Sequence, residues 1–390
     1  MPSLASLGFW LACASLAYVY AGYPLLVVIF GRLRRRHVHQ QPIVPRMSLI
    51  IAAYNEEECI GRCLDAAVAS DYPQHALEIL VVSDGSSDAT ETIVARYEGR
   101  GVRLLRLPRR GKIHALNAAA ARASGEVLVF CDANVVLEAR ALRTLARNFA
   151  DPEVGGVAAN TSYSLPADCE SSSRGEDLYW NYDTWLKQME SWTGSVVSAH
   201  GALYAIRRGL YHPIPDAAVT DDFAISTGVV EQGHRLVFER EARAYEPPAP
   251  RAGGEFRRRM RLMTRGLRAL VLRRRLLNPF RYGFYSLELF SHKVLRRLLP
   301  LSLLVLLATS VVLSDEGMFY AGAVVAQGVF YLLASLGWYL RRTRLGNWRL
   351  LYIPFFYCLA NAAALAALAR FAFGDRIELW SPQRQSRTVP

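Results

Sequence analysis

A long apolar segment near the N-terminus constrains this chain more than any other feature. Residues 4–30 carry no charged side chain, and a run of that length can cross a bilayer as a helix. A cleaved signal peptide begins with basic residues and has a shorter apolar part, whereas here the basic cluster of Arg32 and residues 34–36 follows the run. We therefore expect a retained anchor, with the N-terminus outside and the following residues in the cytosol.

Three further apolar runs lie toward the C-terminus, at about residues 298–313, 319–340 and 352–373. Two acidic residues at 315–316 follow the first run and arginines follow the second. Acidic residues outside and basic residues inside fit four membrane spans. The first run is short and begins near Pro300, so a re-entrant segment, which would place the C-terminus on the opposite side, remains an alternative.

The formal net charge is +12, and the arginines gather beside apolar segments, chiefly at 257–275 and 296–297. Basic residues in such places favour anionic lipid headgroups and phosphates as partners, and we expect no nucleic acid partner. After residue 254 the apolar residues recur at helical spacing with arginines on the opposite face. This pattern predicts amphipathic helices at the lipid interface, and a helix that is merely solvated on its basic side is the alternative.

Between residues 42 and 250 the pattern changes to short β-branched runs that alternate with helical patterns. This alternation is typical of an α/β sheet with crossover helices. We therefore expect a soluble α/β domain between the first membrane span and the amphipathic helices. The predicted strands are 48–53, 78–83, 102–107 and 126–131, and the predicted helices between them include 57–69 and 90–97.

Acidic residues follow three of the predicted strands: Glu56, Asp84 and Asp132. Open α/β sheets bind ligands at the carboxyl edge of their strands, so these residues are candidates for one common site. Residues 132–134, Asp-Ala-Asn, offer two oxygen ligands one residue apart. Such a pair suits a hard divalent ion that bridges diphosphate oxygens.

Two acidic segments also have a plainer interpretation. Residues 83–88 are rich in Asp, Ser and Gly, which are common in helix-capping turns. Residues 220–223 place two adjacent aspartates at the start of a helical pattern, where carboxylates cap helices and stabilise the helix dipole. One aspartate of this pair can cap the helix while the other performs chemistry.

Taken together, the order and spacing of these segments resemble the family 2 glycosyltransferases, whose members include chitin-oligosaccharide, hyaluronan and cellulose synthases. The resemblance covers most of the chain. It implies an α/β GT-A (Rossmann-like) catalytic domain that accompanies the transmembrane segments and the amphipathic interface helices. The matching segments are residues 48–57, 81–88, 111–112 with 115–117, 132–134 and 220–222.

The resemblance also implies a binding site for a nucleotide-sugar donor, with a UDP-sugar expected. Residues around Ala53, Tyr54 and Glu56, together with Asp84, would hold the nucleoside. Lys112 would lie near the base or the diphosphate. A nucleotide sugar needs polar groups for its base, a carboxylate for its hydroxyls and a cation for its phosphates, and these loops could supply them.

In the same comparison, Asp132 is the first acid of the family's D-x-D motif and would bind Mg²⁺ or Mn²⁺ together with the donor diphosphate. Asn134 replaces the second acid, and Asn can ligate through its carbonyl but brings no charge. Asp222 matches the last acid of the T-E-D motif, the general base of the relatives, and Asp221 stands where Glu is usual. The acceptor hydroxyl must lose a proton as it attacks the anomeric carbon, so a carboxylate has to reach it.

The acceptor side departs most from the family. The Q-x-x-R-W motif of the processive synthases is replaced by Arg-Arg-Met-Arg-Leu at residues 258–262. Arg258 and Arg261 could still meet the diphosphate, but the Trp that stacks on an acceptor sugar is lost. His200 and Gly201 fall where relatives line the acceptor pocket, and Asp221 would lie close by. A purely structural role is an equal alternative for the histidine.

The expected function is inverting transfer of a sugar to a lipid-linked or glycan acceptor at the cytosolic face of a bacterial-type inner or plasma membrane. A processive polysaccharide synthase that also secretes its product is the main alternative. A non-catalytic membrane partner is a weaker one. The expected organisation is an anchor over residues 1–36, a catalytic domain over 42–250, interface helices over 254–297, about three spans over 298–373 and a tail over 374–390.

Overall fold

The computed structural model describes residues 3–162, 174–215, 218–246, 255–341, 343 and 345–377, not including the side chains of residues 174–181 and 347. Most of the predicted tail lies outside these residues, as does the junction at 247–254. The chain forms two compact units. The α/β unit is built mainly from Val27–Pro250 and Arg265–Leu287, and the helical unit from Met1–Leu26, Arg251–Thr264 and Glu288–Asp375.

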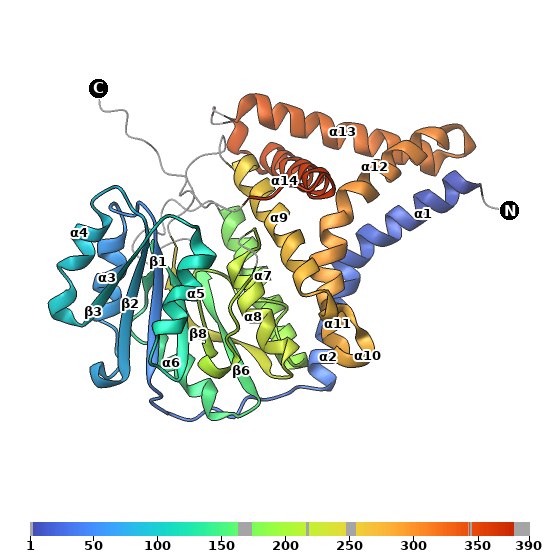
Figure 1. Ribbon diagram of the computed structural model, residues 1–390. Helices are drawn as coiled ribbons and strands as arrows, with labels where there is room; N and C mark the ends of the chain where they lie inside the picture. The colour runs from blue at the N-terminus through green and yellow to red at the C-terminus, as the bar shows by residue number, and fades with distance from the viewer. Residues whose placement is uncertain are drawn as a thin grey trace, which may run out of the picture. The chain divides into compact units, whose positions relative to one another are not determined.

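An eight-stranded sheet organises the α/β unit, with the strand order β3-β2-β1-β4-β7-β6-β8-β5 (Figure 1). Its first half is parallel, because β1 pairs with β2 and β4, and β2 pairs with β3. β1 is buried along its whole length, as expected for a central strand that is covered on both faces. These four strands span Met47–Ala53, Leu77–Asp84, Val102–Leu107 and Val127–Asp132.

Helices connect the parallel strands, because a parallel connection needs a crossover. They are α3 (Ile60–Val68), α4 (Thr90–Ala95) and α5 (Lys112–Arg122), which follow β1, β2 and β3 in turn. The four predicted strands are confirmed, with ends that differ by no more than one residue. The arrangement brings the carboxyl ends of β1, β2 and β4 to one edge of the sheet, which positions the candidate site.

The second half of the sheet is mixed, and the sequence did not predict it. β7 (Leu203–Arg207) runs antiparallel to β4 and to β6 (Val154–Ser162), and β6 pairs in parallel with β8 (Arg235–Tyr245). The short strand β5 (Val136–Leu137) pairs with β8 at the edge. The helices of this half are α6 (Ala141–Arg147), α7 (Arg174–Thr193) and α8 (Asp221–Glu231).

Four helices in the described ranges are long and apolar enough to cross a membrane: Leu4–Leu33, Phe284–Val312, Met318–Leu340 and Arg349–Ala372. The first contains α1 (Leu4–Ala17), a π-helical turn (Tyr18–Gly22) and α2 (Tyr23–Leu33). The last two are α13 and α14.

The second of these helices begins earlier than the apolar run expected at residue 298. It joins α11 (Phe284–Leu289), a π-helical segment (Phe290–Leu295) and α12 (Arg296–Val312). Cations between 292 and 297 interrupt the apolar pattern without breaking the helical backbone, and Pro300 lies inside α12. The predicted interface segment, residues 254–297, therefore overlaps this helix, and the other helices within its bounds are α9 (Glu255–Leu272) and α10 (Pro279–Tyr282).

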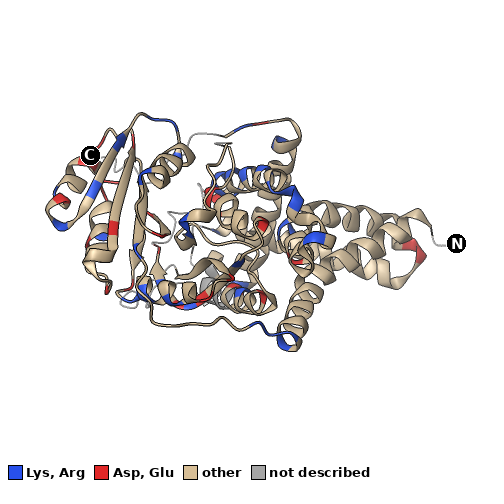
Figure 2. Ribbon diagram, turned by 60° about the horizontal axis from the view of Figure 1, so that its bottom comes forward, with Lys and Arg blue, Asp and Glu red and all other residues tan. Residues whose placement is uncertain are grey.

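Charged residues mark the two ends of the bundle in the helical unit. The turn between α12 and α13 carries Asp315 and Glu316, and Figure 2 shows this acidic turn at the end of the bundle where the N-terminus lies. Arg296 at the start of α12 and Arg341 at the end of α13 lie at the far ends of these helices from the turn. The bundle thus has an acidic end and a basic end.

Close packing before β4 gives a test of the fold. A Cβ on Gly125 would stand 2.5 Å from the Ser48 nitrogen and 2.7 Å from the Met47 carbonyl carbon. These are backbone atoms of β1, so they can move aside only if the two strands separate. We expect Gly125→Ala to destabilise the fold by about 1–3 kcal/mol, which thermal unfolding of the detergent-solubilised full chain would show as a lower midpoint.

Gly99→Ala is the matched control, because a Cβ on Gly99 would meet nothing within 4 Å. Its unfolding midpoint should stay close to that of the wild type. Equal midpoints for the two variants would contradict the close approach of the strands at Gly125.

Candidate active site

The carboxyl ends of three neighbouring strands bring Ala53, Asp84 and Asp132 to the same edge of the sheet. Ala53 pairs with the residue before Asp84, and Asp132 pairs with the residue before Ala53. Two helices begin at this edge, α5 with Lys112 and α8 with Asp221. An open α/β sheet binds ligands at this edge, and the predicted residues do converge there.

Lys112 ties two carboxylates together. Its Nζ lies 2.6 Å from Asp132 Oδ1 and 2.8 Å from Asp221 Oδ2, and its side chain is 11% exposed. Burial alone would lower the pKa of Lys112, but the two carboxylates outweigh burial and raise that pKa above its ordinary value. Lys112 therefore carries its charge at neutral pH.

This arrangement shifts the pKa values of the two carboxylates in opposite directions. Burial raises the pKa of Asp132, and the opposing effect of Lys112 is smaller. Asp221 is also buried, but Lys112 and then Arg265 outweigh the burial and lower its pKa. Asp221 is thus the more firmly ionised partner of the shared ammonium group.

Asp84 is 1% exposed, and its carboxylate is engaged by the loop before α5. Arg109 Nη1 donates to it at 2.7 Å, and the amides of Arg110 and Gly111 donate at 2.8 and 2.9 Å. The Arg109 guanidinium also lies over the Tyr54 ring, 3.2 Å from its centroid. Two predicted donor-binding residues are therefore joined by an arginine, and the same loop sets the position of the following lysine.

Glu56 lies on the loop after β1 and points into the protein. Its side chain is buried, and its Oε2 accepts a hydrogen bond from Cys59 Sγ at 3.1 Å. Its amide donates to Thr90 Oγ1 at 2.7 Å. The preceding Asn55 has φ 52° and accepts from the Ser87 amide at 2.8 Å. Asn55 and Glu56 thus connect the loop after β1 to the loop after β2 and to the start of α4.

Asp132 and Asp222 face the same small space beside Gly201. A Cβ on Gly201 would stand 3.6 Å from Asp132 Oδ2 and 3.6 Å from Asp222 Oδ2. Thr220 is the N-cap of α8 without a side-chain cap hydrogen bond, and Asp222 Oδ1 instead accepts from the Phe223 amide at 2.7 Å. One oxygen of Asp222 therefore accepts a hydrogen bond in the first turn of α8, and the other faces the space beside Gly201.

Two arginines from beyond the predicted catalytic domain hold α8 in place. Arg265 donates through Nε and Nη2 to the Val219 carbonyl at 3.0 and 2.6 Å. Arg273 donates to the Ala224 carbonyl at 3.1 and 2.7 Å and pairs with Glu231 at 2.5 Å. Both belong to the α/β unit, so the acidic N-terminus of α8 is fixed within this unit.

The remaining predicted residues have different surroundings. His200 Nδ1 lies 3.4 Å from Thr161 Oγ1, which fits a structural histidine as well as an acceptor contact. Asn134 is half-buried in the turn after β4. Arg258 and Arg261 lie in the part of α9 that belongs to the helical unit. The ionic contacts among Lys112, Asp132 and Asp221 join β4, α5 and α8.

Arg109, Arg265 and Arg273 did not stand out in the sequence. The signal for Arg109 was its position immediately before the Gly-Lys pair that opens α5. Arg265 and Arg273 lie in a basic stretch that the sequence attributed to lipid contact. Arg265 is nonetheless buried, as is Ala269 one helical turn later, and both lie on the opposite side of α9 from Met260 and Met263.

The site fits a hard divalent cation only if further ligands come from outside the protein. Asp132 Oδ1 is held by Lys112, while Oδ2 faces the space beside Gly201. In the part of the chain that the structure describes, no group of three or more His, Cys, Asp or Glu could hold a metal ion. Mg²⁺ keeps several waters and is often bound through one or two carboxylates and substrate phosphates. The residues present therefore suit a cation that a diphosphate helps to bind.

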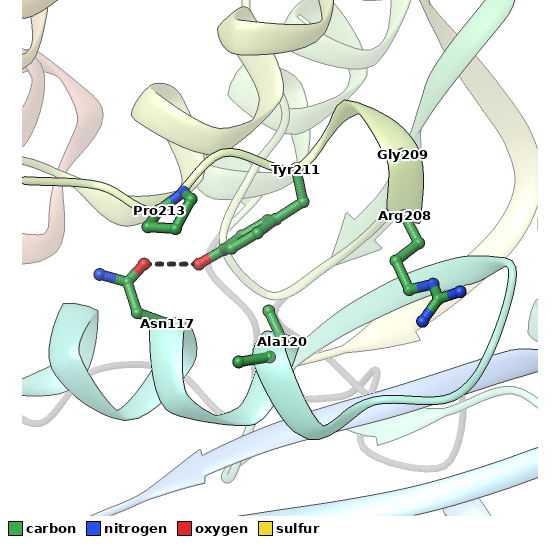
Figure 3. Close-up of a pocket in the computed structure, with 7 residues that line it drawn as sticks. Asn117, Ala120, Arg208, Gly209, Tyr211 and Pro213 are labelled. Atoms are coloured by element: carbon green, nitrogen blue, oxygen red, sulfur yellow. Dashed lines mark hydrogen bonds between the residues drawn. The ribbon is translucent and has the colours of Figure 1, made fainter.

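A separate pocket of about 420 Å³ lies farther along α5. Figure 3 shows Asn117 and Tyr211 joined there, because Tyr211 OH donates to Asn117 Oδ1 at 2.7 Å. The same oxygen accepts from the Ile214 amide at 3.0 Å, and Arg208 lines the other side. Asn117 belongs to a segment that carried the family resemblance, and here it fixes the loop after β7 against α5.

Lys112→Met tests the ionic bridge. We expect a lower unfolding midpoint near pH 8, with a loss of about 3 kcal/mol, because removing one partner strands buried charges. The folded-state pKa of Asp221 is lowered, so its stabilisation is present above the unfolded-state pKa and disappears as pH falls through the folded value. Without the lysine that pKa rises, so the difference from the wild type should shrink toward about pH 4.5.

Lys187→Met is the control, because Lys187 pairs with Asp183 at 2.7 Å within α7, away from the bridge. Its loss of unfolding stability should be smaller than that of Lys112→Met. Equal losses of stability in the two variants would contradict the bridge. So would a loss of stability in Lys112→Met that does not change with pH.

Comparisons with known proteins agree with this geometry. Residues 48–214 match the family described as Glycosyl transferase family 2. "Probable glycosyltransferase YdaM" of Bacillus subtilis is 27% identical over 272 residues, which are 65% of this chain and 64% of that protein. Poly-beta-1,6-N-acetyl-D-glucosamine synthase of Staphylococcus epidermidis is 25% identical over 60% of this chain and 57% of that protein. The match thus spans less than two thirds of either relative.

A solved structure shares the fold over nearly the whole chain. It is a mannosyltransferase from Pyrobaculum calidifontis in complex with GDP-Man and Mn²⁺, with a TM-score of 0.69 and 24% identity, and the match covers 95% of this chain and 100% of that one. The predicted GT-A fold is therefore confirmed. Residues 48–214 of this chain thus match the model of the Glycosyl transferase family 2 domain, the family that the motifs of the sequence resemble.

Proposed function

We propose that this chain is an inverting glycosyltransferase that moves a sugar from a nucleotide sugar to a lipid-linked or glycan acceptor at the cytosolic face of a membrane. The observation that carries the proposal is the convergence of Asp132 and Asp222 on the space beside Gly201, with Lys112 bridging Asp132 and Asp221. A carboxylate that can bind a cation and a carboxylate that can accept a proton thus face one reaction volume.

The donor would bind at the carboxyl edge of β1, β2 and β4. Tyr54, with the Arg109 guanidinium over its ring, and the loop that Asp84 holds would receive the nucleoside. Lys112 would contact the diphosphate, and Asp132, with Asn134 beside it, would bind Mg²⁺ or Mn²⁺. The cation would supply charge neutralisation for the departing diphosphate.

Asp222 would act as the general base. Its Oδ2 would accept the proton of the acceptor hydroxyl while that oxygen attacks the anomeric carbon. The bond from this carbon to the diphosphate oxygen breaks on the opposite side, so one displacement inverts the anomeric centre. Gly201 supports this assignment, because a residue without a side chain keeps the space between Asp132 and Asp222 open.

The four helices that are long enough to cross a membrane support an acceptor that is itself bound to a membrane. The acidic turn at one end of the bundle and the arginines at the other fit the positive-inside rule. With the arginines in the cytosol, the residues after the first span lie on that side as well. The α/β unit would then work on the cytosolic face.

A processive polysaccharide synthase is the second candidate function. It is favoured by the similarity to poly-beta-1,6-N-acetyl-D-glucosamine synthase. Residues 258–262 speak against it, because they lack the Trp that offers a stacking surface to an acceptor sugar. The length of the radiolabelled product separates the two functions, since single transfer adds one sugar and a synthase makes a ladder or a polymer.

Asp222→Asn tests the proposed chemistry. We expect release of the nucleoside diphosphate from the matching donor to fall by about 10²–10⁴-fold, because the amide cannot accept the acceptor proton. The measurement uses purified, detergent-solubilised full chain, Mn²⁺ or Mg²⁺, membrane lipid extract as acceptor, and a panel of UDP-sugars with GDP-mannose.

Asp71→Asn is the control for this experiment, because Asp71 lies in an exposed ion pair with Arg143. Its turnover should match that of the wild type. Wild-type turnover that survives in Asp222→Asn would exclude Asp222 as the base. Absence of wild-type turnover with every donor would favour a non-catalytic membrane partner.

Asn134→Asp tests the metal assignment, because this change restores the second acid of the family motif. An added carboxylate strengthens binding of a hard cation, so we expect half-maximal turnover at a several-fold lower Mn²⁺ concentration. Asp132→Asn should have the opposite effect and require more Mn²⁺. If both variants keep the Mn²⁺ dependence of the wild type, the cation does not bind at residues 132–134.

A further inference from the structure

Tyr204 stands on the same face of the sheet as Asp132. The β4–β7 register pairs Phe130 with Tyr204, and directly paired residues share a face of the sheet, as do residues i and i+2 of one strand. The two rings confirm this placement, since they stack with centroids 5.0 Å apart. Asp132 follows Phe130 by two positions, so Asp132 and Tyr204 are diagonal neighbours within reach of an aromatic side chain.

The Tyr204 hydroxyl is an unused hydrogen-bonding group inside the protein. The residue is 1% exposed, and its OH has no hydrogen-bond partner within the described residues. Tyr211, whose ring also stacks on Phe130, instead donates a hydrogen bond from its hydroxyl to Asn117. A buried hydroxyl without a partner costs about 1–3 kcal/mol, so its presence calls for a reason.

The surroundings of Tyr204 keep its hydroxyl protonated. Burial raises the pKa of Tyr204, and the negative charges of Asp221, Asp222 and Asp132 raise it further. The hydroxyl is therefore a donor at any physiological pH, and the groups around it are acceptors. In the free protein Lys112 forms ion pairs with Asp132 and Asp221. The Tyr204 hydroxyl makes no hydrogen bond to either carboxylate.

We propose that Tyr204 is a positioning residue that donates a hydrogen bond to Asp221 when Lys112 turns from this carboxylate to the donor diphosphate. The inference rests on the proposed function, because it needs a diphosphate that draws the ammonium group away. Asp221 is then a buried carboxylate that has lost its closest cation. The Tyr204 hydroxyl replaces that contact and keeps the first turn of α8, with Asp222, in place for the reaction.

Arg265 does not make this donor redundant. It lies close enough to Asp221 to contribute to the lowering of its pKa, but its Nε and Nη2 donate to the Val219 carbonyl. Those contacts hold the chain before α8. A neutral donor is also better suited to Asp221 than another cation, because it adds no charge that would compete with Lys112 in the free protein.

The first test compares stability with ligand affinity in the full chain. In the free protein Tyr204→Phe removes an unpaired hydroxyl, so its unfolding midpoint should rise by about 2–4 °C. Its dissociation constant for UDP or GDP with Mn²⁺, whichever the wild type binds, should rise about tenfold by titration calorimetry. A purely structural role would not combine greater stability with weaker binding.

Tyr72→Phe is the matched control, because Tyr72 is also buried but its OH donates to the Pro45 carbonyl at 2.5 Å. This variant should lose stability and keep the nucleotide affinity of the wild type. An affinity of Tyr204→Phe within twofold of the wild type would overturn the proposal.

The second test needs no ligand. In Lys112→Met the carboxylate of Asp221 has lost its ammonium partner, so the Tyr204 hydroxyl should already be engaged. Adding Tyr204→Phe to this background should therefore lower the midpoint, whereas the same change raises it in the wild type. The same sign in both backgrounds overturns the inference. Failure of the wild type to bind any nucleoside diphosphate, with the sign reversal intact, would instead count against the proposed function.

Discussion

The bridge from Lys112 to Asp132 and Asp221 is the interaction on which the site depends. Carboxylates that gather at one partly buried edge repel each other strongly, because the interaction of charges grows as water is excluded. One ammonium group at 2.6 and 2.8 Å from two of them offsets this repulsion. It also joins two elements that are far apart in the chain, since Asp132 ends β4 and Asp221 begins α8.

The position of Lys112 is in turn set by Asp84. The buried Asp84 carboxylate accepts the Gly111 amide, and Gly111 has φ 98°, a conformation that glycine adopts without strain. Lys112 follows as the first residue of α5. A carboxylate that the sequence suggested for donor binding thus has a second task in the free protein, which is to aim the lysine at the two aspartates.

The parallel half of the sheet could be predicted from the sequence, because its strands are buried on both faces and read as short continuous apolar runs. The mixed half could not. β7 pairs with β6 through residues 46 to 50 positions away and with β4 through residues 72 to 80 positions away. No local pattern in the sequence predicts such pairings. The boundary of the membrane helix at Phe284 was also hidden, because hydropathy drops at the cations near residue 292 while the backbone stays helical.

The same distinction applies to the site. Lys112, Asp132, Asp221 and Asp222 could be predicted because each lies in a short motif with a strand end or a helix start beside it. The contacts that hold these four residues in place could not be predicted from the sequence. Arg265 reaches Val219 across 46 positions, and Tyr204 carries no motif at all. Its relation to Asp132 depends on the register of β4 and β7, which only the fold determines.

An uncharged Asn at position 134 fits the charges that lie at this edge of the sheet. Asp132, Asp221 and Asp222 already place three carboxylates at the edge that would receive a diphosphate, against the single charge of Lys112 and the nearby Arg265. A fourth carboxylate at position 134 would strengthen cation binding but also increase the repulsion of a diphosphate that arrives without a cation. An amide keeps an oxygen for the metal and avoids that repulsion. If the site binds a cation and a diphosphate as proposed, the affinity for one would depend on the other, because the protein alone would balance neither charge.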